Sequence, residues 1–367
     1  MLSFSAHRIG MSNPADMSGL KSLIDDGTID PATIIASIGK TEGNGGANDF
    51  TRALATLSAS ILIGSHLDQS PDEVAKRVAF VWSGGCEGVL SPHMTVFTRQ
   101  VIPGETSSGP GSLAISVQRT RSILPEEVGR TVEVLEVANA VRRALDDLGC
   151  MASDVHYVQV KGPLLTPAGL ADAAARGREV VTADPNLSKA YARGATALGV
   201  AIALGEVEEH DLREEVIAKD MNLYSSVAST SAGGELTDCE VLVFANSSRA
   251  VSTMRIGHAT LADAVDIDGA RAALRNAGLD FICEPDQAQR RRIRAVFAKA
   301  ESPIRGLLRG QRTTMLSDAD INYERHARAA TGAVLTALTG DPRIFVSGGT
   351  EHQCPPGHAP IAAIVDI

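Results

Sequence analysis

One short stretch occurs three times in the chain and decides the expected fold. It reads Val-Trp-Ser83-Gly84-Gly85-Cys-Glu87, then Ser-Thr-Ser231-Ala232-Gly233-Gly-Glu235, and finally Phe-Val-Ser347-Gly348-Gly349-Thr-Glu351. Each copy is followed by another apolar run, as expected for a strand. A serine beside glycines lets backbone N–H groups approach a ligand closely, because glycine has no Cβ to obstruct the approach. Three such turns in equivalent contexts predict a repeated ligand-binding feature.

Each serine turn belongs to a longer repeat with the same order of elements. A helical segment ending in glycine comes first, and an apolar run ending in lysine follows at residues 34–40, 155–161 and 293–299. The first two runs are rich in β-branched residues and predict strands, whereas the third fits a strand or a helix. Before each serine turn, an arginine opens an apolar helical pattern; the three are Arg52, Arg193 and Arg328.

The repeat predicts an α/β protein made of three structurally similar units in a pseudo-threefold arrangement around a central active site. We place the units at residues 1–103, 112–250 and 255–367. The glycine- and proline-rich stretch 103–111 is the expected linker between the first two units.

The composition of the chain indicates which partners and which cellular compartment to expect. The chain has 367 residues, a net charge of −10 and a hydrophobic fraction of 44%. This acidic balance argues against a partner that is a nucleic acid or a membrane surface. Five cysteines, an odd number, fit a reducing compartment better than a disulfide framework. The N-terminus lacks the apolar core of a signal peptide, so we expect a cytoplasmic protein.

Three units around an axis would bring three lysines, three arginines and three serines together. Arginine donates several N–H groups and accepts none, so the set favours a small planar ligand ringed with carbonyl oxygens. The glutamates of the repeat are expected to act as caps or to pair with the arginines. A serine beside a lysine supplies a nucleophile and a base. The expected substrate-binding residues are Lys40, Arg52, Ser83, Gly84, Arg193, Ser231, Ala232, Lys299, Arg328, Ser347 and Gly348.

The three lysines differ in their local sequence. Lys40 and Lys299 are each followed two residues later by a glutamate, whereas Lys161 is followed by Gly-Pro. A nearby carboxylate favours the charged ammonium, so this difference singles out Lys161 as the lysine able to become neutral. The sequence therefore predicts Lys161 as the catalytic base and Ser231 as the nucleophile.

Several motifs resemble one known family. They include Gly39-Lys-Thr-Glu-Gly-Asn-Gly45, Val158-Gln-Val-Lys161, Ser226-Val-Ala-Ser-Thr-Ser-Ala-Gly233 and Ser347-Gly-Gly-Thr-Glu-His-Gln353. Across nearly its whole length the chain resembles the ring-opening amidohydrolases, which comprise cyanuric acid hydrolases and barbiturases. The resemblance implies three similar units around one site, hydrolysis of a cyclic imide and chemistry at the middle Lys–Ser pair. It also implies a homotetramer.

The same resemblance implies a structural divalent cation, Mg or Ca, in the third unit, while the chemistry itself uses no cofactor. Its expected side-chain ligand is Glu301, and carbonyl groups of the loop residues Thr350, Gln353, Cys354, Pro355 and His358 are expected to complete the site. The chain departs from the family here, because Cys354 replaces a glycine and Gly357-His358-Ala359 replaces a glycine run.

Four functions remain open at this point. The first is opening of cyanuric acid to carboxybiuret, which then yields biuret and CO2. The second is a barbiturase that opens barbituric acid to ureidomalonate. The others are a non-catalytic binder of planar carbonyl compounds and a zinc hydrolase using His352, Cys354 and His358, whose spacing matches no usual zinc pattern. Complete arginine and serine sets favour the more symmetric ring of cyanuric acid.

Overall fold

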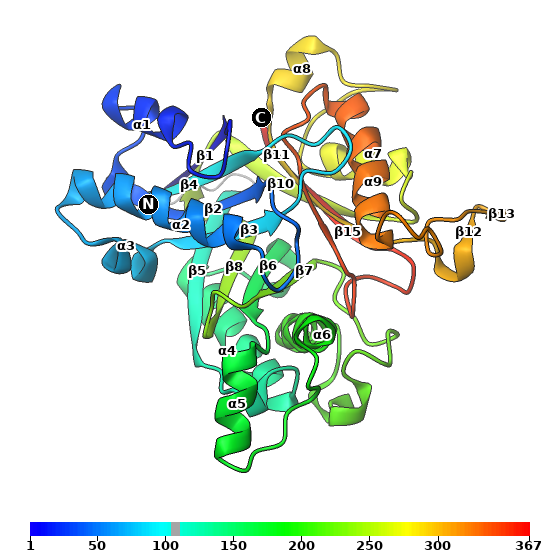
Figure 1. Cartoon of the computed structure of the whole chain (residues 1–367). Helices are drawn as coiled ribbons and strands as arrows, with labels where there is room; N and C mark the ends of the chain where they lie inside the picture. The colour runs from blue at the N-terminus through cyan, green and yellow to red at the C-terminus, as the bar shows by residue number, and fades with distance from the viewer. Residues whose placement is uncertain (104–110) are drawn as a thin grey trace.

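Three α/β units surround a common centre in the computed structural model, which describes residues 1–103 and 111–367 (Figure 1). The first unit contains β1 (Leu2–Gly10), α1 (Ser18–Asp25), β2 (Ile34–Thr41), α2 (Phe50–Leu67), α3 (Pro71–Arg77), β3 (Ala79–Gly84) and β4 (His93–Val101). The second contains β5 (Ser112–Ser122), α4 (Thr131–Leu148), β6 (Val155–Pro163), α5 (Pro167–Ala175), α6 (Pro185–Leu204), β7 (Ala228–Gly233) and β8 (Asp238–Ser247).

The third unit follows the same plan. Its elements are β10 (Met254–Leu261), α7 (Ile267–Asn276), α8 (Gln287–Arg291), β11 (Ile293–Ala300), α9 (Tyr323–Thr339), β14 (Phe345–Gly348) and β15 (Ala359–Asp366). A small hairpin of β12 (Leu307–Leu308) and β13 (Gln311–Arg312) projects from it. The lysine run of this unit, which the sequence left open between strand and helix, is the strand β11.

The sheets of the three units have the same topology. Their strand orders are β3-β2-β4-β1, β7-β6-β8-β5 and β14-β11-β15-β10. In each sheet the lysine strand runs parallel to the serine strand, and the register pairs Lys40 with Ser83, Lys161 with Ser231 and Lys299 with Ser347. Each serine strand is therefore an edge strand of its sheet, with one row of backbone groups free of sheet pairing.

Local sequence explains where the arginine-bearing helices begin and end. Asp49, Asp184 and Asn322 cap the N-termini of α2, α6 and α9 by accepting hydrogen bonds from backbone N–H groups. Gly205 and Gly340 follow α6 and α9 in the left-handed conformation, with φ of 72° and 74°. These boundaries fix which turn of each helix carries its arginine.

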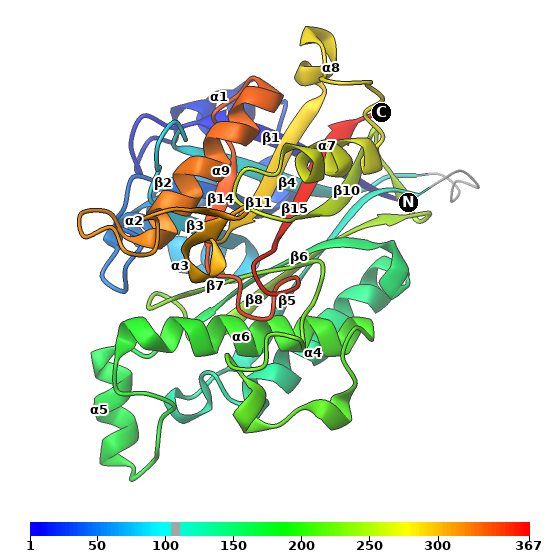
Figure 2. The same ribbon diagram turned by 90° about the vertical axis from the view of Figure 1, so that its right-hand side faces the viewer.

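The hydrophobic core lies where the sheets meet and again beneath the helices of each unit (Figures 1 and 2). At the meeting point, one phenylalanine from each unit forms a triangle. Phe97 and Phe244 have ring centroids 5.2 Å apart, and Phe297 lies 6.3 and 6.0 Å from them. Such a shared apolar centre ties the units into one body.

The proposed unit boundaries remain predictions. Residues 104–110 of the expected linker lie outside the described residues. Near the second boundary, β9 (Ala250–Val251) pairs in parallel with β1 of the first unit, so this connection joins a neighbouring sheet. Within the described residues, no helix combines the length and the apolar character needed to cross a membrane.

Candidate active site

The three serine turns and the three arginines line one small cavity of about 50 Å³ at the centre of the molecule. The arginines reach it from α2, α6 and α9, and the serines from β3, β7 and β14. The predicted residues that line it are Arg52, Ser83, Gly84, Lys161, Arg193, Ser231, Ala232, Arg328, Ser347 and Gly348. Residues separated by up to 296 positions in the sequence thus meet at one site, as the repeat predicts.

Each arginine pairs with the motif glutamate of another unit. The three pairs are Arg52 with Glu235 (Nε–Oε1, 3.1 Å), Arg193 with Glu351 (Nε–Oε2, 2.7 Å) and Arg328 with Glu87 (Nη2–Oε1, 2.7 Å). The pairs run from the first unit to the second, from the second to the third and from the third to the first. They hold the guanidinium groups in fixed orientations at the cavity wall.

The lysines join the units in the opposite direction. Each Nζ donates to the backbone carbonyl of the residue that precedes a serine in another unit. The three bonds are Lys40 to Val346 (2.6 Å), Lys299 to Thr230 (2.6 Å) and Lys161 to Trp82 (3.4 Å). Carbonyls at the sheet edges are thereby satisfied by buried ammonium or amine groups.

Lys161 is the least constrained of the three lysines. Within the part of the chain that the structure describes, Lys161 has one carbonyl contact, and it is long at 3.4 Å, whereas Lys299 has a second bond of 2.9 Å to the carbonyl of Gly348. Lys161 belongs to the described residues that line the cavity, whereas Lys40 and Lys299 do not. The middle lysine therefore differs from the other two in geometry, although it occupies the same register position.

The reason that the sequence gives for singling out Lys161 is wrong. Lys161 does have a carboxylate neighbour, because Glu235 Oε1 lies 3.4 Å from its Nζ. Lys40 has the equivalent contact with Glu87 Oε2 at 3.6 Å. Both carboxylates come from the serine turn of the same unit, while Glu42, two residues after Lys40, is exposed. The turn brings its fourth residue after the serine back to the lysine, which adjacency in the sequence does not reveal.

Burial lowers the pKa of all three lysines. The pKa of Lys40 falls to about 8, against the opposing effect of Glu87. The pKa of Lys299 falls to about 7 because Arg193 adds to the effect of burial. Burial also lowers the pKa of Lys161, with Glu235 opposing it. For Glu235, burial raises the pKa, but Lys161 and Arg52 outweigh that effect and lower it to about 2.

The serine hydroxyls face the cavity with few protein partners. Within the described residues, the buried Oγ atoms of Ser231 and Ser347 have no hydrogen-bond partner. Lys40 Nζ donates to Ser83 Oγ at 3.4 Å. An unpartnered buried hydroxyl is costly, so these groups are suited to a ligand that supplies the missing bonds.

The small residues after the serines follow from crowding. A Cβ on Gly84 would lie 1.7 Å from Asp49 Oδ2, and one on Gly348 would lie 2.8 Å from Arg328 Nη1. The middle unit has Ala232 at this position. Glycine in the two outer units therefore lets the chain pass close to these charged side chains without displacing them.

The sequence interpretation missed four residues of the cavity wall, which are Gly45, Trp82, Lys189 and Glu324. Lys189 precedes Arg193 by four residues, and Glu324 precedes Arg328 by four. Residues at this spacing share one face of a helix, so the arginine positions contained the signal for both. Glu324 contacts Arg193 at 3.6 Å and Arg328 at 3.8 Å, which links two arginines of the wall.

The predicted cation ligands lie in and beside a loop that packs on the second unit. Thr350 donates its hydroxyl to Glu301 Oε2, and the Ser302 N–H donates to Oε1 at 3.0 Å. Burial raises the pKa of Glu301, and no basic side chain of the described residues forms an ion pair with it. A half-buried carboxylate without a cationic partner fits a hard divalent cation, which prefers oxygen ligands.

The other residues of the predicted site form hydrogen bonds with the protein, and of their carbonyl groups, which are expected as ligands, that of Pro355 accepts one of these bonds. Gln353 Oε1 accepts from the Thr230 N–H at 2.8 Å, and the Cys354 N–H donates to the Ser225 carbonyl at 2.9 Å. Pro355 and His358 leave the loop by a turn in which the His358 N–H donates to the Pro355 carbonyl at 2.9 Å. Across residues 1–103 and 111–367, no group of three or more His, Cys, Asp or Glu side chains is placed to hold a metal.

The side chains of the zinc-hydrolase hypothesis point to different partners. His352 Nε2 accepts from the Ala218 N–H at 2.8 Å, so its Nδ1–H donates to the Leu223 carbonyl. Both ring nitrogens are then used, and neither lone pair is free for a metal. Cys354 Sγ lies 3.6 Å from the Ser226 carbonyl and 3.7 Å from Thr260 Oγ1. This geometry does not favour a zinc site.

Comparison with known proteins agrees with this geometry. The family model described as amidohydrolase ring-opening protein matches residues 5–366. A cyclic amide hydrolase from Azorhizobium caulinodans is 61% identical over 98% of both chains. The chain belongs to the ring-opening amidohydrolase family. Within the family, a cyanuric acid amidohydrolase from Enterobacter cloacae is 49% identical over 97% of both chains. Barbiturase 1 from a Nocardioides species is 42% identical over 98% of both.

Solved structures of the family have the same fold. One cyanuric acid hydrolase, described as an evolutionary innovation by structural concatenation, superposes with a TM-score of 0.94 at 46% identity, covering 100% of both chains. A cyanuric acid hydrolase from A. caulinodans gives a TM-score of 0.90 at 42% identity over 100% and 99% of the two chains. The predicted α/β fold of three similar units and the predicted cyclic amide hydrolase activity are confirmed.

Proposed function

We propose that this amidohydrolase opens cyanuric acid. The observation that carries the proposal is the cavity to which each unit contributes an arginine and a serine. Cyanuric acid is a planar ring with three equivalent carbonyl groups, so each carbonyl meets the same donors from a different unit. Guanidinium and hydroxyl groups donate to carbonyl oxygens, and the size of the cavity restricts it to a small ring. Several relatives are cyanuric acid amidohydrolases, which supports the assignment.

In the proposed first step, neutral Lys161 takes the proton of Ser231 as Oγ attacks a ring carbonyl carbon. The negative charge that develops on the carbonyl oxygen is stabilised by arginine and by backbone N–H groups of the serine turn. The ring C–N bond then breaks, and the Lys161 ammonium gives its proton to the departing nitrogen. The result is an opened chain held as an ester on Ser231.

In the second step, water attacks the ester carbon while Lys161 accepts a proton from that water. Ser231 leaves as an alkoxide and takes the proton back from Lys161, so the pair returns to its starting state. The product is carboxybiuret, which loses CO2 to give biuret. One water is consumed, and one ring C–N bond is broken.

The geometry of the middle unit supports this choice of residues. Lys161 lines the cavity and has a long carbonyl contact of 3.4 Å, so its Nζ can exchange protons without breaking a strong bond. Ser231 is its register partner on the adjacent parallel strand and has a hydroxyl free of protein partners within the described residues. The outer lysines each hold a carbonyl at 2.6 Å, as expected for structural roles.

A second candidate, the opening of barbituric acid to ureidomalonate, is favoured by a departure from threefold symmetry. The residues four positions before the three arginines are Asn48, Lys189 and Glu324, and the last two line the cavity. A wall with one basic and one acidic edge fits a ring in which one position differs from the other two. The barbiturase relative belongs to the same family.

The two functions are separated by assaying the purified protein against both rings under identical conditions. Cyanuric acid hydrolysis is followed as biuret formation, and barbituric acid hydrolysis as ureidomalonate formation. We expect kcat/KM for cyanuric acid to exceed that for barbituric acid by at least about tenfold. A preference for barbituric acid would assign the second function, and tight binding of either ring without turnover would overturn both.

Three associated features belong to the proposal. The cation, Mg or Ca, would be held by Glu301 and by oxygens of the 350–358 loop, where it would neutralise the half-buried carboxylate and brace the loop on the second unit. The assembly would be a homotetramer in the cytoplasm. Chelation is expected to lower the thermal midpoint of the protein while leaving turnover of the folded enzyme intact, because no proposed step uses a metal.

A further inference from the structure

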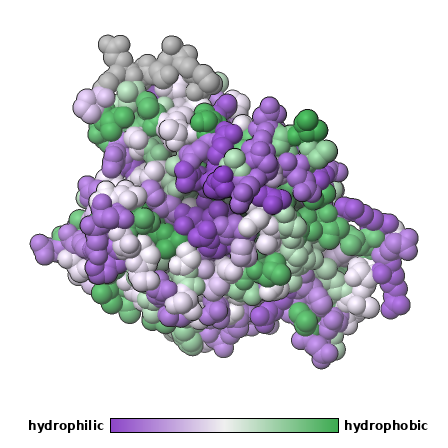
Figure 3. Space-filling view, turned by 90° about the horizontal axis from the view of Figure 1, so that it is seen from above, coloured by the Kyte–Doolittle hydropathy of each residue, from purple (hydrophilic) through white to green (hydrophobic). Residues whose placement is uncertain are grey.

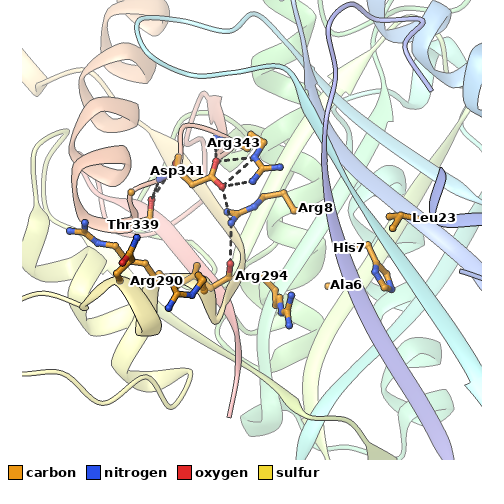
Figure 4. Close-up of a pocket in the computed structure, with 13 residues that line it drawn as sticks. Ala6, His7, Arg8, Leu23, Arg290, Arg294, Thr339, Asp341 and Arg343 are labelled. Atoms are coloured by element: carbon orange, nitrogen blue, oxygen red, sulfur yellow. Dashed lines mark hydrogen bonds and ion pairs between the residues drawn. The ribbon is translucent and has the colours of Figure 1, made fainter. Parts of the chain in front are cut away.

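A second, larger pocket lies away from the active site, between the first and third units. It encloses about 660 Å³ and is bordered by β1, α1, α8, the start of β11 and the loop after α9 (Figure 4). Seen from above, the face that carries α8 shows a group of strongly hydrophilic residues near its middle (Figure 3). Five arginines line the pocket, which are Arg8, Arg290, Arg291, Arg294 and Arg343.

The carboxylates around this pocket do not balance its arginines. Asp341 is the one acidic residue among the described residues of the lining, and it is shared by Arg8 at 3.1 Å and Arg343 at 2.6 Å (Figure 4). Outside the lining, Asp366 pairs with Arg294, and Glu284 lies 3.7 Å from Arg290. Five guanidinium groups therefore face three carboxylates, and Arg291 has no ion pair within the described residues. The excess of two positive charges stands against a chain whose net charge is −10.

Arg8 shows the imbalance most directly. Its Nη2 donates to the Ile293 carbonyl at 3.1 Å, but its buried Nη1 has no partner within the described residues. Burial lowers the pKa of Arg8, Asp341 opposes this effect, and the charges of Arg343 and Arg294 add to it. A buried cationic donor facing like charges lacks the acceptor that would satisfy it.

The other places where the units meet show that the fold does not need these charges. Arg8, Val117 and His258 occupy equivalent positions on the first strands of the three units. Their partners on the neighbouring strands, which are Thr95, Leu242 and Ala362 in the same order, are themselves equivalent. Arg294 stands five residues before its lysine, as do Ile35 and His156. The equivalent pairs are thus Arg8 with Arg294, His258 with His156, and Val117 with Ile35.

The aliphatic pair packs against the central core, so the strand framework accepts residues without charge at this position. Two arginines in the same place repel each other, and the carboxylate that each contacts, Asp341 for Arg8 and Asp366 for Arg294, leaves Arg8 Nη1 without a partner within the described residues. The arginines of this one junction therefore need an explanation beyond packing.

We propose that this basic pocket binds a small polyanion carrying two or more phosphate or carboxylate groups. Guanidinium groups bind both kinds of group through paired N–H donors, and Arg8, Arg291 and Arg294 supply donors with no or incomplete partners. The pocket volume falls within the ~300–1,000 Å³ typical of small-molecule sites. Leu23, which is half-buried, adds an apolar side chain to the wall that can contact the body of the ligand. The inference rests on this pocket alone and does not depend on which ring the active site opens.

The test uses the intact protein and inorganic pyrophosphate as the probe. Isothermal titration calorimetry at low ionic strength is carried out on the wild type and on the double variant Arg291→Gln/Arg294→Gln. Both side chains are exposed, so the fold should tolerate the change. The matched control, Arg178→Gln/Arg312→Gln, removes the same charge from exposed arginines elsewhere. A parallel titration with citrate compares carboxylate with phosphate.

We expect the wild type and the control to bind at least one of the two anions with equal affinity and the pocket variant to bind it about tenfold more weakly or less well still. The anion that binds more tightly identifies the anchoring group. Absence of binding of both anions to the wild type would overturn the proposal. Equal losses in the pocket and control variants would also overturn it, because they would show a response to net charge alone. A pocket variant that changes oligomeric state without any anion binding would assign the pocket to a contact between subunits.

Discussion

The three units carry the same residues at the centre of the molecule but different residues at the junctions between units. At the centre, every unit presents lysine, arginine and serine at equivalent register positions. At the junctions, equivalent positions carry two arginines, two histidines or two aliphatic residues. The framework of strands is common to both regions, so packing of the strands does not dictate the residue at either place.

The difference indicates what holds the central residues constant. A junction must only join two units, and arginine, histidine and aliphatic side chains all accomplish that. Under the proposed function, the central cavity must bind a ring with several similar edges. Its ion pairs and lysine hydrogen bonds form closed cycles through all three units. Changing one member of a cycle disturbs two units, whereas changing a junction residue disturbs one contact.

The largest expected effect is an unequal loss of turnover when the three central serines are replaced one at a time. Ser231→Ala and Lys161→Ala should abolish turnover, with losses of up to ~10⁶ as expected for a missing nucleophile or base. Ser83→Ala and Ser347→Ala should lose roughly tenfold to a few hundredfold, because each removes a hydrogen bond that positions the ring. Steady-state rates, together with substrate binding by calorimetry, make the comparison.

Folding and binding serve as the control for these four variants. All should unfold with wild-type cooperativity and still bind the ring. If Ser83→Ala or Ser347→Ala were as inactive as Ser231→Ala with binding intact, the middle unit would not be the special one. An active Ser231→Ala variant would reject the serine mechanism altogether.

The order of elements was predictable because the repeated motif supplied three independent copies of the same pattern. The equivalent residues 40, 161 and 299 therefore fall at matching positions on strands, although the third strand alone was ambiguous from composition. The pairing of arginines with motif glutamates was also predictable in kind. The unit that supplies each glutamate was not predictable, because the repeat does not show in which order the three units follow one another around the axis.

The electrostatic reason for choosing Lys161 was not predictable from adjacency. Glu42 follows Lys40 closely in sequence but is exposed, whereas Glu87 reaches Lys40 through the fold of the serine turn. The structure supports Lys161 for a different reason, which is its access to the cavity and its long carbonyl contact. Lys189 and Glu324 lie one helical turn before their arginines, at a position where the first unit has Asn48, so the repeated pattern does not include them.

An effect of intermediate size is expected at the glutamates that contact the lysines of the middle and first units. Glu235 contacts Lys161 and Arg52, and Glu87 contacts Lys40 and Arg328. Glu235→Gln removes a charge that raises the pKa of Lys161, so Lys161 should lose its proton at lower pH. Since the base must be neutral, the acid limb of the kcat/KM profile should move to lower pH.

The matched variant is Glu87→Gln, which frees an arginine in the same way without touching Lys161. Both variants should raise KM about tenfold, because each loosens one guanidinium group at the cavity wall. Only Glu235→Gln should shift the acid limb. The same shift in both variants, or a shift in Glu87→Gln alone, would contradict the assignment of Lys161 as the base.

The smallest expected effect concerns the histidine junction between the second and third units. His156 Nδ1 lies 2.9 Å from His258 Nδ1, so one ring donates and the other must be unprotonated there. Burial lowers the pKa of both histidines, and the charge of His258 helps to lower that of His156 to about 4. Around the pair, Arg255 lowers the pKa of His156 and Asp154 raises it, while Glu206 raises that of His258.

The sign of the pH effect follows from proton counts. Between about pH 6.5 and pH 4, His156 binds a proton in the unfolded chain but not in the folded one, so stability falls as the pH falls through this window. The variant His156→Ile/His258→Val copies the aliphatic junction of the first two units and removes this proton uptake.

Between pH 7.5 and pH 5 this double variant should lose about 1 kcal/mol less unfolding free energy than the wild type, a modest difference because both rings are partly exposed to solvent. Denaturant titrations at the two pH values measure it, and His210→Asn, at an exposed histidine, should retain the wild-type dependence. If the double variant lost as much stability as the wild type, the histidine pair would be no more sensitive to pH than the aliphatic junction that it replaces.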